Sequence, residues 1–163
     1  MKIIQVDKNN KDFVELCLLL ENFQHQMLPT LKEKGYTLTD VEGITAFLLY
    51  DGEIAIGSIG IKQVDDKTCE IVRVYVRDEC RGKGYAKLLF DHVEEYAREH
   101  GYVRAEMVTW AESTSALALY KKLGYTLSDV KISEWFKGLE YVELHKDLKS
   151  GSYIKATRTP HSY

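Results

Sequence analysis

The stretch from Glu70 to Gly101 constrains the fold most, because its periodicity changes at a glycine-rich turn. EIVRVYV is an apolar, strand-like run, CRGKGYAK follows it, and LLFDHVEEYAREHG has the apolar spacing of an amphipathic helix. A helix that begins here leaves its first amides without intrahelical partners, at the positive end of its dipole. Because Gly82 and Gly84 carry no Cβ, a ligand can approach this main chain closely. The turn is therefore predicted to bind an anion, with Arg81, Lys83 and Lys87 adding positive charge.

Successive amides offer more donors than one carboxylate needs, so the turn favours a diphosphate or a similar ligand. A P-loop requires four residues between its first glycine and Gly-Lys-Ser/Thr, a spacing that does not occur here. A dinucleotide fingerprint would place its third glycine at position 87, which is Lys87. The alternative is a structural turn whose cations are solvated.

Length and composition predict one compact domain over residues 1–148. The chain has 163 residues, of which 45% are hydrophobic, enough for one well-filled core. The longest aliphatic run, Leu16 to Leu20, is far shorter than the roughly 20 residues that cross a bilayer, and the first residues lack the apolar core of a secretion signal. We therefore expect a cytoplasmic protein with no membrane partner.

Charge and cysteine usage narrow the function classes. A formal net charge of −3 argues against nucleic-acid binding, which usually needs a basic surface. Cys17, Cys69 and Cys80 are odd in number and have no CxxC spacing, so we expect free thiols without a disulfide framework. The histidines fit no metal motif such as HExxH, and we expect no metal site.

The remaining chain alternates between strand and helix patterns without an internal repeat, which predicts a mixed sheet with helices on its faces. The expected strands are KIIQV, ITAFLLY, EIAIGSIGIKQV, CEIVRVYV and AEMVTW, with two more between Tyr125 and Leu148. ITAFLLY and EIAIGSIGIKQV form a hairpin around a turn at Asp51 and Gly52. Expected helices span Asp12 to Met27, the segment after Gly84 to about His100, and STSALALYKKLG. The segment 149–163 is expected to be either a disordered tail or a segment that packs on a partner subunit in a homodimer.

Two motifs together resemble the GNAT N-acetyltransferase superfamily: EIVRVYVRDECRGKGYAKLLFDHVEEYA and, at the expected separation, SALALYKKLGY. The resemblance implies a mixed, mostly antiparallel sheet that splays open between EIVRVYV and AEMVTW, with helices on both faces. It also implies that acetyl-coenzyme A is the acyl donor, with its pantetheine arm paired to the main chain at Val74 and Val76. The amides that would hold its diphosphate belong to Arg81, Gly82, Lys83, Gly84, Tyr85 and Ala86.

The sequence departs from the family pattern at two positions. Glu79 stands where the family often has Gln or Arg, and an acidic side chain there would repel phosphates unless it points away. Ser113 replaces the asparagine common at the start of the second motif, and it can still form hydrogen bonds with the cofactor, although fewer.

Tyr120 is the general acid that the resemblance implies, because it occupies the tyrosine of ALALYKKLGY. A phenol with a pKa near 10 can protonate a departing thiolate if the two are in contact. The alternative is a core tyrosine, since Ala116, Leu119, Tyr120 and Leu123 share one helical face.

Glu70 is the expected base. Alternation along CEIVRVYV places Glu70 on one face with Val72, Val74 and Val76, where desolvation would raise its pKa. The resemblance adds that some members carry a glutamate base on this strand. The alternatives are a solvated Glu70 at the strand end, Glu106 on the next strand, and a water chain.

Direct transfer to the acceptor is favoured over a ping-pong route through Cys80 or Cys69, because no histidine is paired with a cysteine by motif. By resemblance, the acceptor lies against HQMLPTLKEKGYTLTD and SEWFKGLEY. Candidate contacts in and beside these segments are Gln24, His25, Tyr36, Glu42, Trp135 and Phe136.

The sequence thus predicts an acetyltransferase that uses acetyl-coenzyme A to acetylate a small-molecule or peptide primary amine. An acyl-coenzyme A sensor or interaction module on the same fold is the alternative, and it would not need Tyr120. A generic nucleotide-binding domain is a third.

Overall fold

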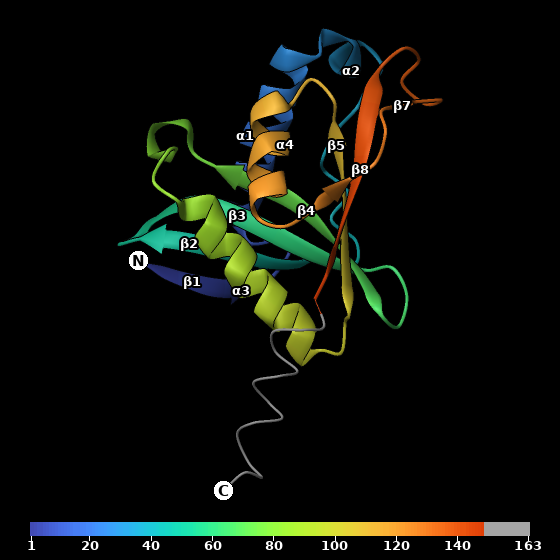
Figure 1. Ribbon diagram of the computed structural model, residues 1–163. Coiled ribbons are helices and arrows are strands. Elements are labelled where there is room, and N and C mark those ends of the chain that lie inside the picture. The colour runs from blue at the N-terminus through green and yellow to red at the C-terminus, as the bar shows by residue number, and fades with distance from the viewer. Residues whose placement is uncertain (149–163) are drawn as a thin grey trace, which may run out of the picture.

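The computed structural model describes residues 1–148 (Figure 1), so the expectation for residues 149–163 lies outside the described residues. The strands are β1 (Lys2–Val6), β2 (Thr45–Asp51), β3 (Ile54–Gln63), β4 (Thr68–Val76), β5 (Arg104–Trp110), β6 (Thr126–Leu127), β7 (Lys131–Ile132) and β8 (Glu140–Asp147). The helices are α1 (Lys11–Met27), α2 (Pro29–Glu33), the 3₁₀ turn η1 (Asp78–Cys80), α3 (Tyr85–Glu99) and α4 (Thr114–Lys122). The expected long elements are confirmed, and the last region contains three strands instead of two.

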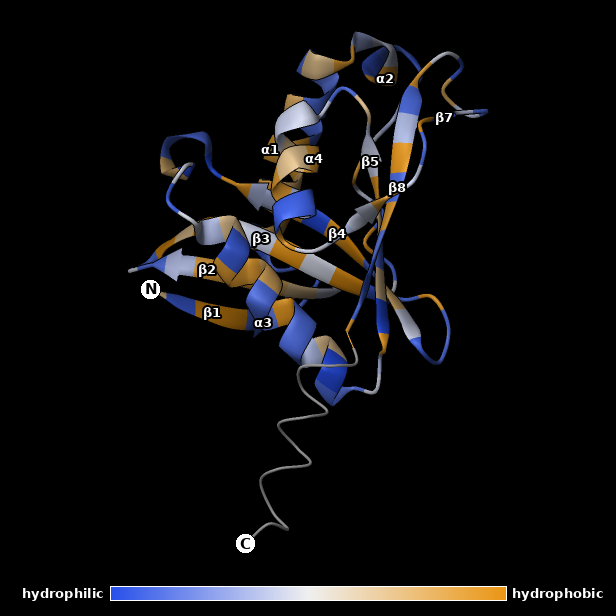
Figure 2. Ribbon diagram, viewed as in Figure 1, coloured by the Kyte–Doolittle hydropathy of each residue, from blue (hydrophilic) through white to orange (hydrophobic). Residues whose placement is uncertain are grey.

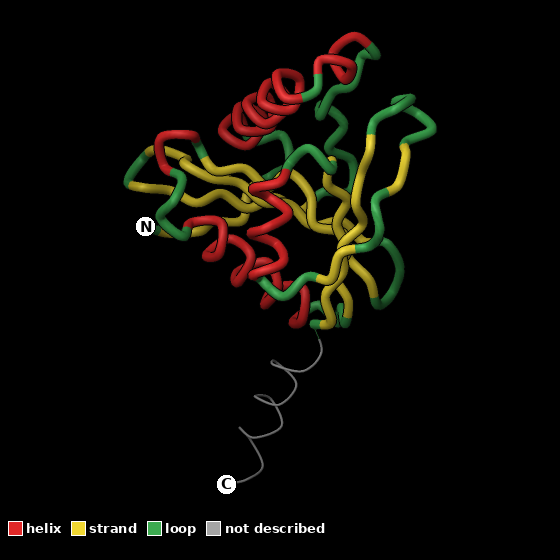
Figure 3. Tube along the Cα trace, turned by 45° about the horizontal axis from the view of Figure 1, so that its top comes forward, coloured by secondary structure: helices red, strands yellow, loops and turns green. Residues whose placement is uncertain are grey.

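The strands form one sheet in the order β1-β2-β3-β4-β5-β8-β6, with β7 also paired to β8. All of these pairs are antiparallel except β4 with β5, which are parallel. Helix α1 covers one face of the sheet, and α3 and α4 cover the other (Figure 3). The expected mixed, mostly antiparallel sheet with helices on both faces is confirmed.

Each face of the sheet has its own apolar core. The larger core packs α3 and α4 on the sheet through residues such as Leu89, Phe90 and Tyr120. The smaller core packs Phe13, Leu16 and Cys17 of α1 on the opposite face. In Figure 2, β2 and β3 are largely coloured as hydrophobic, whereas α3 shows alternating hydrophobic and hydrophilic bands, as expected for a helix half covered by a sheet.

Local sequence explains where several elements begin and end. The Asn10 side chain accepts hydrogen bonds from the amides of Asp12 and Phe13 and thereby caps α1. Gly52 has a φ of +61° in the β2–β3 hairpin, although the two loop residues are Gly52 and Glu53 rather than Asp51 and Gly52. Gly101 follows α3 with a φ of +86°, as a C-terminal glycine cap does.

A β-bulge in β4 overturns one prediction from the sequence. Arg73 has a φ of +56° and is the only non-glycine residue with positive φ among residues 1–148, and the register with β3 shifts there. The extra residue inverts the side-chain alternation. Val72 therefore packs on the α1 face, whereas Val74 and Val76 pack on the α3 face. The prediction that Glu70, Val72, Val74 and Val76 share one face is wrong.

A buried ionic network joins α3 to the end of the sheet. The Glu94 side chain is only 4% exposed, and its carboxylate accepts hydrogen bonds from the Tyr125 hydroxyl at 2.7 Å and from Lys146 Nζ at 2.8 Å. Lys146 Nζ also donates to the carbonyl oxygen of Leu123. The charges are thus compensated inside the core.

Among residues 1–148, no helix has the length and apolar composition needed to span a membrane.

Candidate active site

The turn between β4 and α3 presents a run of free amides. The amides from Gly82 to Lys87 have no hydrogen-bond acceptor within residues 1–148, and the first bond into the helix runs from the Leu88 amide to the carbonyl oxygen of Gly84. Gly82 and Gly84 have φ values of +78° and +82°, and a Cβ built on either would meet nothing within 4 Å. The glycines are therefore needed for backbone conformation, and the amides face open space at a helix N-terminus.

Arg81 differs from the residues that follow it. Its amide donates to the carbonyl oxygen of Asp78 at 3.3 Å, so the run of free amides begins one residue later than the expected Arg81. Its guanidinium donates to Val76 O, pairs with Asp78, and stacks over the rings of Phe23 and Tyr75 at 5.0 and 5.2 Å. Arg81 thus holds the turn against β4 and α1.

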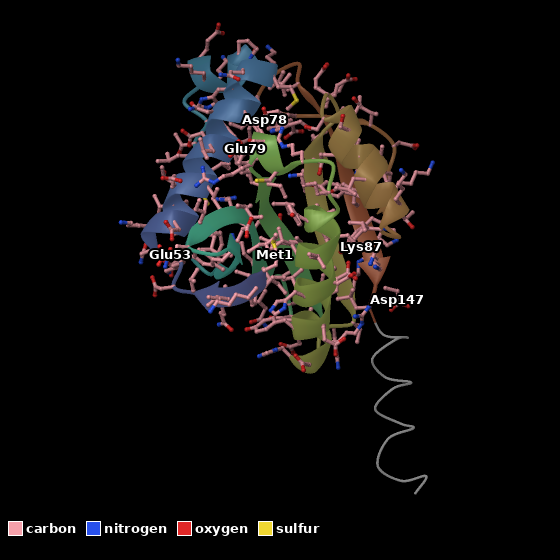
Figure 4. All side chains as sticks on the ribbon, turned by 90° about the vertical axis from the view of Figure 1, so that its left-hand side faces the viewer. Met1, Glu53, Asp78, Glu79, Lys87 and Asp147 are labelled. Carbon is pink, nitrogen blue, oxygen red and sulfur yellow. The ribbon has the colours of Figure 1, made fainter. Side chains whose placement is uncertain are left out.

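The charged side chains around the turn point in different directions. In Figure 4, Asp78 and Glu79 lie toward α1, and Lys87 lies on the other side of the turn. Lys87 forms an ion pair with Asp91 one helical turn later. Glu79 is exposed and is absent from the lining of the cavity described below, as a site for phosphates would require.

The strands β4 and β5 separate beside this turn. They pair only from Thr68 to Glu70 and from Arg104 to Glu106, and beyond these residues each continues without the other. The Arg77 amide donates to Ile56 O on β3, so alternation turns the peptide groups of Val74 and Val76 toward the gap. The gap opens into a cavity of about 790 Å³, which the glycine turn also lines.

Tyr120 of α4 lies in the wall of this cavity. Its side chain is buried, with 8% exposure, and packs against Phe90 with a centroid distance of 5.4 Å. Its hydroxyl forms no hydrogen bond within residues 1–148, and burial raises its pKa to about 12. Ala116, Leu119 and Leu123 pack against the same core, so the expected helical face is confirmed. Tyr120 is both a core residue and a cavity residue.

Two glutamates flank the point where the strands separate, but only one reaches the cavity. Glu70 lines it, whereas Glu106, its neighbour on β5, is held in an ion pair with Arg104 at 2.8 Å. Glu70 forms no ion pair or hydrogen bond within the described part of the chain.

Ser113 is the N-cap residue of α4, lines the cavity, and donates to Met27 Sδ at 3.5 Å.

The three cysteines differ in their surroundings. Burial raises the pKa of Cys17 to about 11 and that of Cys69 to about 12, which keeps both thiols protonated near neutral pH. Cys80 is half-buried and lines the cavity beside the glycine turn. All three thiols are free.

Three aromatic rings from distant segments meet beside the cavity, which Tyr36 and Trp110 line. Tyr36, Trp110 and Phe136 contact one another edge to face with centroid distances of 5.3 to 6.0 Å. Burial raises the pKa of Tyr36, while a hydrogen bond from Trp110 and the charge of Arg73 lower it. We call these three residues the aromatic triad.

The structure brings together only part of the residues proposed as acceptor contacts. Gln24 and Tyr36 line the cavity, and Phe136 contacts Tyr36. Trp135 is 88% exposed, and Glu42 forms an ion pair with Lys8. His25 hydrogen-bonds to the main-chain oxygen of Tyr36.

Arg73 and Trp110 also line the cavity, and neither was predicted from the sequence as a site residue. Trp110 ends a strand, where an aromatic residue gives no special signal. Arg73 occupies a strand position whose bulge has no sequence signature, since no glycine marks it.

No group of three or more His, Cys, Asp or Glu side chains in residues 1–148 is placed to hold a metal ion.

Comparison with known proteins identifies a family and relatives of this chain. Residues 9–125 match the Acetyltransferase (GNAT) family. The uncharacterized N-acetyltransferase YjgM of Escherichia coli is 32% identical over 108 residues, which make up 57% of this chain and 64% of YjgM. The chain thus spans less than two thirds of YjgM, and its matches cover 34–41% of other curated relatives.

Solved structures share the fold at low identity. A GNAT family acetyltransferase from Elizabethkingia anophelis with acetyl-CoA bound aligns with a TM-score of 0.68 and 18% identity, covering 90% of this chain and 97% of that one. An acetyltransferase from Bacillus subtilis in complex with CoA gives the same TM-score and coverage at 20% identity.

Proposed function

The chain belongs to the acetyltransferase (GNAT) family, and from this premise we propose that it transfers the acetyl group of acetyl-coenzyme A to a primary amine. The observation that carries the proposal is the run of six amides from Gly82 to Lys87, which have no acceptor within residues 1–148 and lie beside the gap between β4 and β5. A turn of this kind suits a diphosphate, and the gap suits an extended arm that needs main-chain partners. Two relatives of the same fold hold acetyl-CoA or CoA in their crystal structures.

The residues present suit the diphosphate and the pantetheine arm of the coenzyme. The amides of Gly82, Lys83, Gly84, Tyr85 and Ala86 would bind the diphosphate, with Arg81 supporting the turn. The peptide groups of Val74 and Val76 would pair with the pantetheine arm, although the carbonyl of Val76 already accepts a hydrogen bond from Arg81. Ser113 would contribute a hydroxyl from the start of α4.

Glu70 and Tyr120 would carry the proton transfers. Acetyl-coenzyme A supplies an activated acetyl group that an uncharged amine can attack directly. The incoming amine is almost wholly in its ammonium form at pH 7, and Glu70 would accept a proton from it. Tyr120 would donate its hydroxyl proton to the departing sulfur and regain a proton lost by the new amide nitrogen. Its raised pKa keeps this hydroxyl protonated at neutral pH and also makes the phenol a weaker acid.

Two measurements test the proposal in order. Thermal shifts with acetyl-coenzyme A, coenzyme A, ATP and NAD test the binding site, since a ligand at about 100 times its Kd adds roughly 2.7 kcal/mol of stability. Stabilisation by both coenzyme A forms but not by ATP or NAD is expected, and equal stabilisation by all four would indicate a generic nucleotide site. Release of free thiol over a panel of primary amines then separates an enzyme from an acyl-coenzyme A sensor, which would bind without turnover.

We also propose a cytoplasmic location and assembly into a homodimer. Three free cysteines are in keeping with a reducing, cytoplasmic setting. A homodimer is tested by sedimentation velocity over a range of protein concentrations.

A further inference from the structure

Among residues 1–148, Arg73 is the one arginine that forms no ion pair with a carboxylate. Residues 1–148 contain five arginines, and the other four each form an ion pair: Arg77 with Glu15, Arg81 with Asp78, Arg98 with Glu94 and Glu95, and Arg104 with Glu106. Arg73 is only partly exposed and lines the cavity. A partly desolvated guanidinium without a counter-ion costs free energy unless a ligand supplies one.

The position of Arg73 is enforced by the backbone around it. The hydroxyl of the fully buried Ser58 donates to Arg73 O at 2.9 Å, which holds the bulge in place. Arg73 adopts a left-handed conformation that is unfavourable for a non-glycine residue. Its NH2 group donates to the main-chain oxygen of Asp40 at 2.7 Å, which anchors the guanidinium at one corner. The remaining guanidinium nitrogens have no hydrogen bond to oxygen in the described residues.

The side chains nearest to Arg73 do not neutralise it. Cys17, Glu21 and Gln24 lie at helical spacing on α1. The charge of Arg73 lowers the pKa of the Cys17 thiol and that of Glu21 raises it, so both charges lie near Cys17. Glu21 is not within ion-pair distance of Arg73, and its carboxylate accepts the amide of Leu38 at 2.7 Å. Gln24 Oε1 and Arg73 Nε are the buried side-chain polar atoms without a partner in the part of the chain that the structure describes. One unused acceptor and one unused donor thus line the same cavity.

We propose that Arg73 binds a carboxylate of the acceptor, so that the substrate is a free amino acid with its own carboxylate. This inference rests on the proposed acetyl transfer. An arginine suits this role because its planar fork of donors matches a carboxylate and forms charge-assisted hydrogen bonds. Gln24 lines the same cavity, where its Oε1, without a partner among residues 1–148, would accept a hydrogen bond from the substrate amine, and Tyr36 and Trp110 of the aromatic triad also line it.

The test compares matched amines that differ only in the carboxylate. Thiol release from acetyl-coenzyme A is measured for phenylalanine, phenylalanine amide and phenethylamine, and for lysine and its decarboxylated form, cadaverine. A dipeptide with a free amino terminus tests a carboxylate that is farther from the amine. The wild type is expected to prefer the free amino acid over its decarboxylated and amide forms by at least about tenfold in kcat/KM, the usual range for a hydrogen bond to a charged group.

Two substitutions assign this preference to Arg73. Arg73→Gly accepts the positive φ and removes the guanidinium, and it is expected to lower kcat/KM about 10- to 100-fold for amino acids. Decarboxylated amines should change by less than about threefold, because they have no group for Arg73 to bind. Arg73→Lys keeps the charge and should recover part of the preference. Thermal unfolding of both variants checks that the bulge is retained.

The outcomes separate this inference from the proposed function. Equal use of amino acids and decarboxylated amines by the wild type would overturn the role of Arg73 and leave acetyl transfer standing. Better use of the dipeptide than of free amino acids would also overturn it. If no amine is acetylated although acetyl-coenzyme A binds, the proposed function fails. The carboxylate site is then judged by calorimetric binding of phenylalanine and phenethylamine to the wild type and Arg73→Gly with coenzyme A present. Absence of Arg73-dependent binding of phenylalanine would overturn it.

Discussion

Glu70 and Glu106 are the last paired residues of β4 and β5 before the two strands separate. They are neighbours in a parallel register, yet Glu106 is bound by Arg104 and Glu70 lines the cavity. The strand register thus gives two chemically identical side chains different surroundings, and it supplies a control for the assignment of the base.

Glu70→Gln is expected to lower kcat by about 10²- to 10⁴-fold and to remove the acidic limb of the pH–rate profile, because a general base loses activity when it is protonated. Glu106→Gln is the matched control and should retain the limb. Rates are measured by thiol release at saturating acetyl-coenzyme A. An unchanged acidic limb in Glu70→Gln would exclude Glu70 as the base.

Tyr120→Phe is expected to lower kcat at least about tenfold with little change in coenzyme A affinity, because it removes a proton donor and little volume. Tyr96→Phe makes the same change at a residue that does not line the cavity between β4 and β5, and it should leave kcat unaltered. Steady-state rates and calorimetric binding check both variants. Wild-type turnover in Tyr120→Phe would remove Tyr120 from the mechanism.

Tyr120 also predicts a loss of stability in alkali. An unfolded tyrosine titrates near pH 10, whereas burial raises the pKa of Tyr120 to about 12 in the folded chain. Between these values the folded state keeps a proton that the unfolded state releases, so stability falls as the pH rises through this window. Urea unfolding should show a smaller alkaline loss in Tyr120→Phe than in the wild type, by about 2–3 kcal/mol. Equal losses would contradict the assigned shift.

Gly84→Ala should weaken binding of coenzyme A because it strains the left-handed residue that precedes the free amides of α3. Gly52→Ala is its control, since Gly52 also has positive φ and open space around its Cα but lies in the β2–β3 hairpin. Both variants should lose about 1–2 kcal/mol of stability. Only Gly84→Ala should raise the Kd measured by calorimetry, and a similar Kd in both would argue against the turn as the binding site.

The buried network around Glu94 should dominate the stability of the α3 side. Glu94→Ala leaves Lys146 and Tyr125 without the carboxylate to which both donate. We expect a loss of about 3–5 kcal/mol in the free energy of unfolding. Glu95→Ala removes only a more exposed ion pair with Arg98 on the same helix and should cost less than about 1 kcal/mol. Urea denaturation compares the two, and equal losses would show that the network contributes no more than a surface pair.

The sequence by itself determined the local features of this protein. Hydrophobic periodicity located the long strands and helices, and it placed Tyr120 on the inner face of α4. The turn at Gly82 and Gly84 was predictable because left-handed residues need glycine and because a helix start always leaves amides free. These features depend on residues only a few positions apart.

The tertiary structure alone decided the features that depend on distant pairings. The bulge at Arg73 arises from the register of β4 on β3 and from the buried Ser58 hydroxyl, so alternation along β4 could not reveal it. The aromatic triad joins a loop residue, a strand end and a second loop, which the chain brings together only when the sheet is complete. The family resemblance implied the separation of β4 from β5, but no local period shows it, since β4 leaves β5 after Glu70 while β5 stays paired with β8 along its whole length. Local periods specify which face of an element is apolar, whereas register and strand separation depend on packing between segments that the sequence does not place side by side.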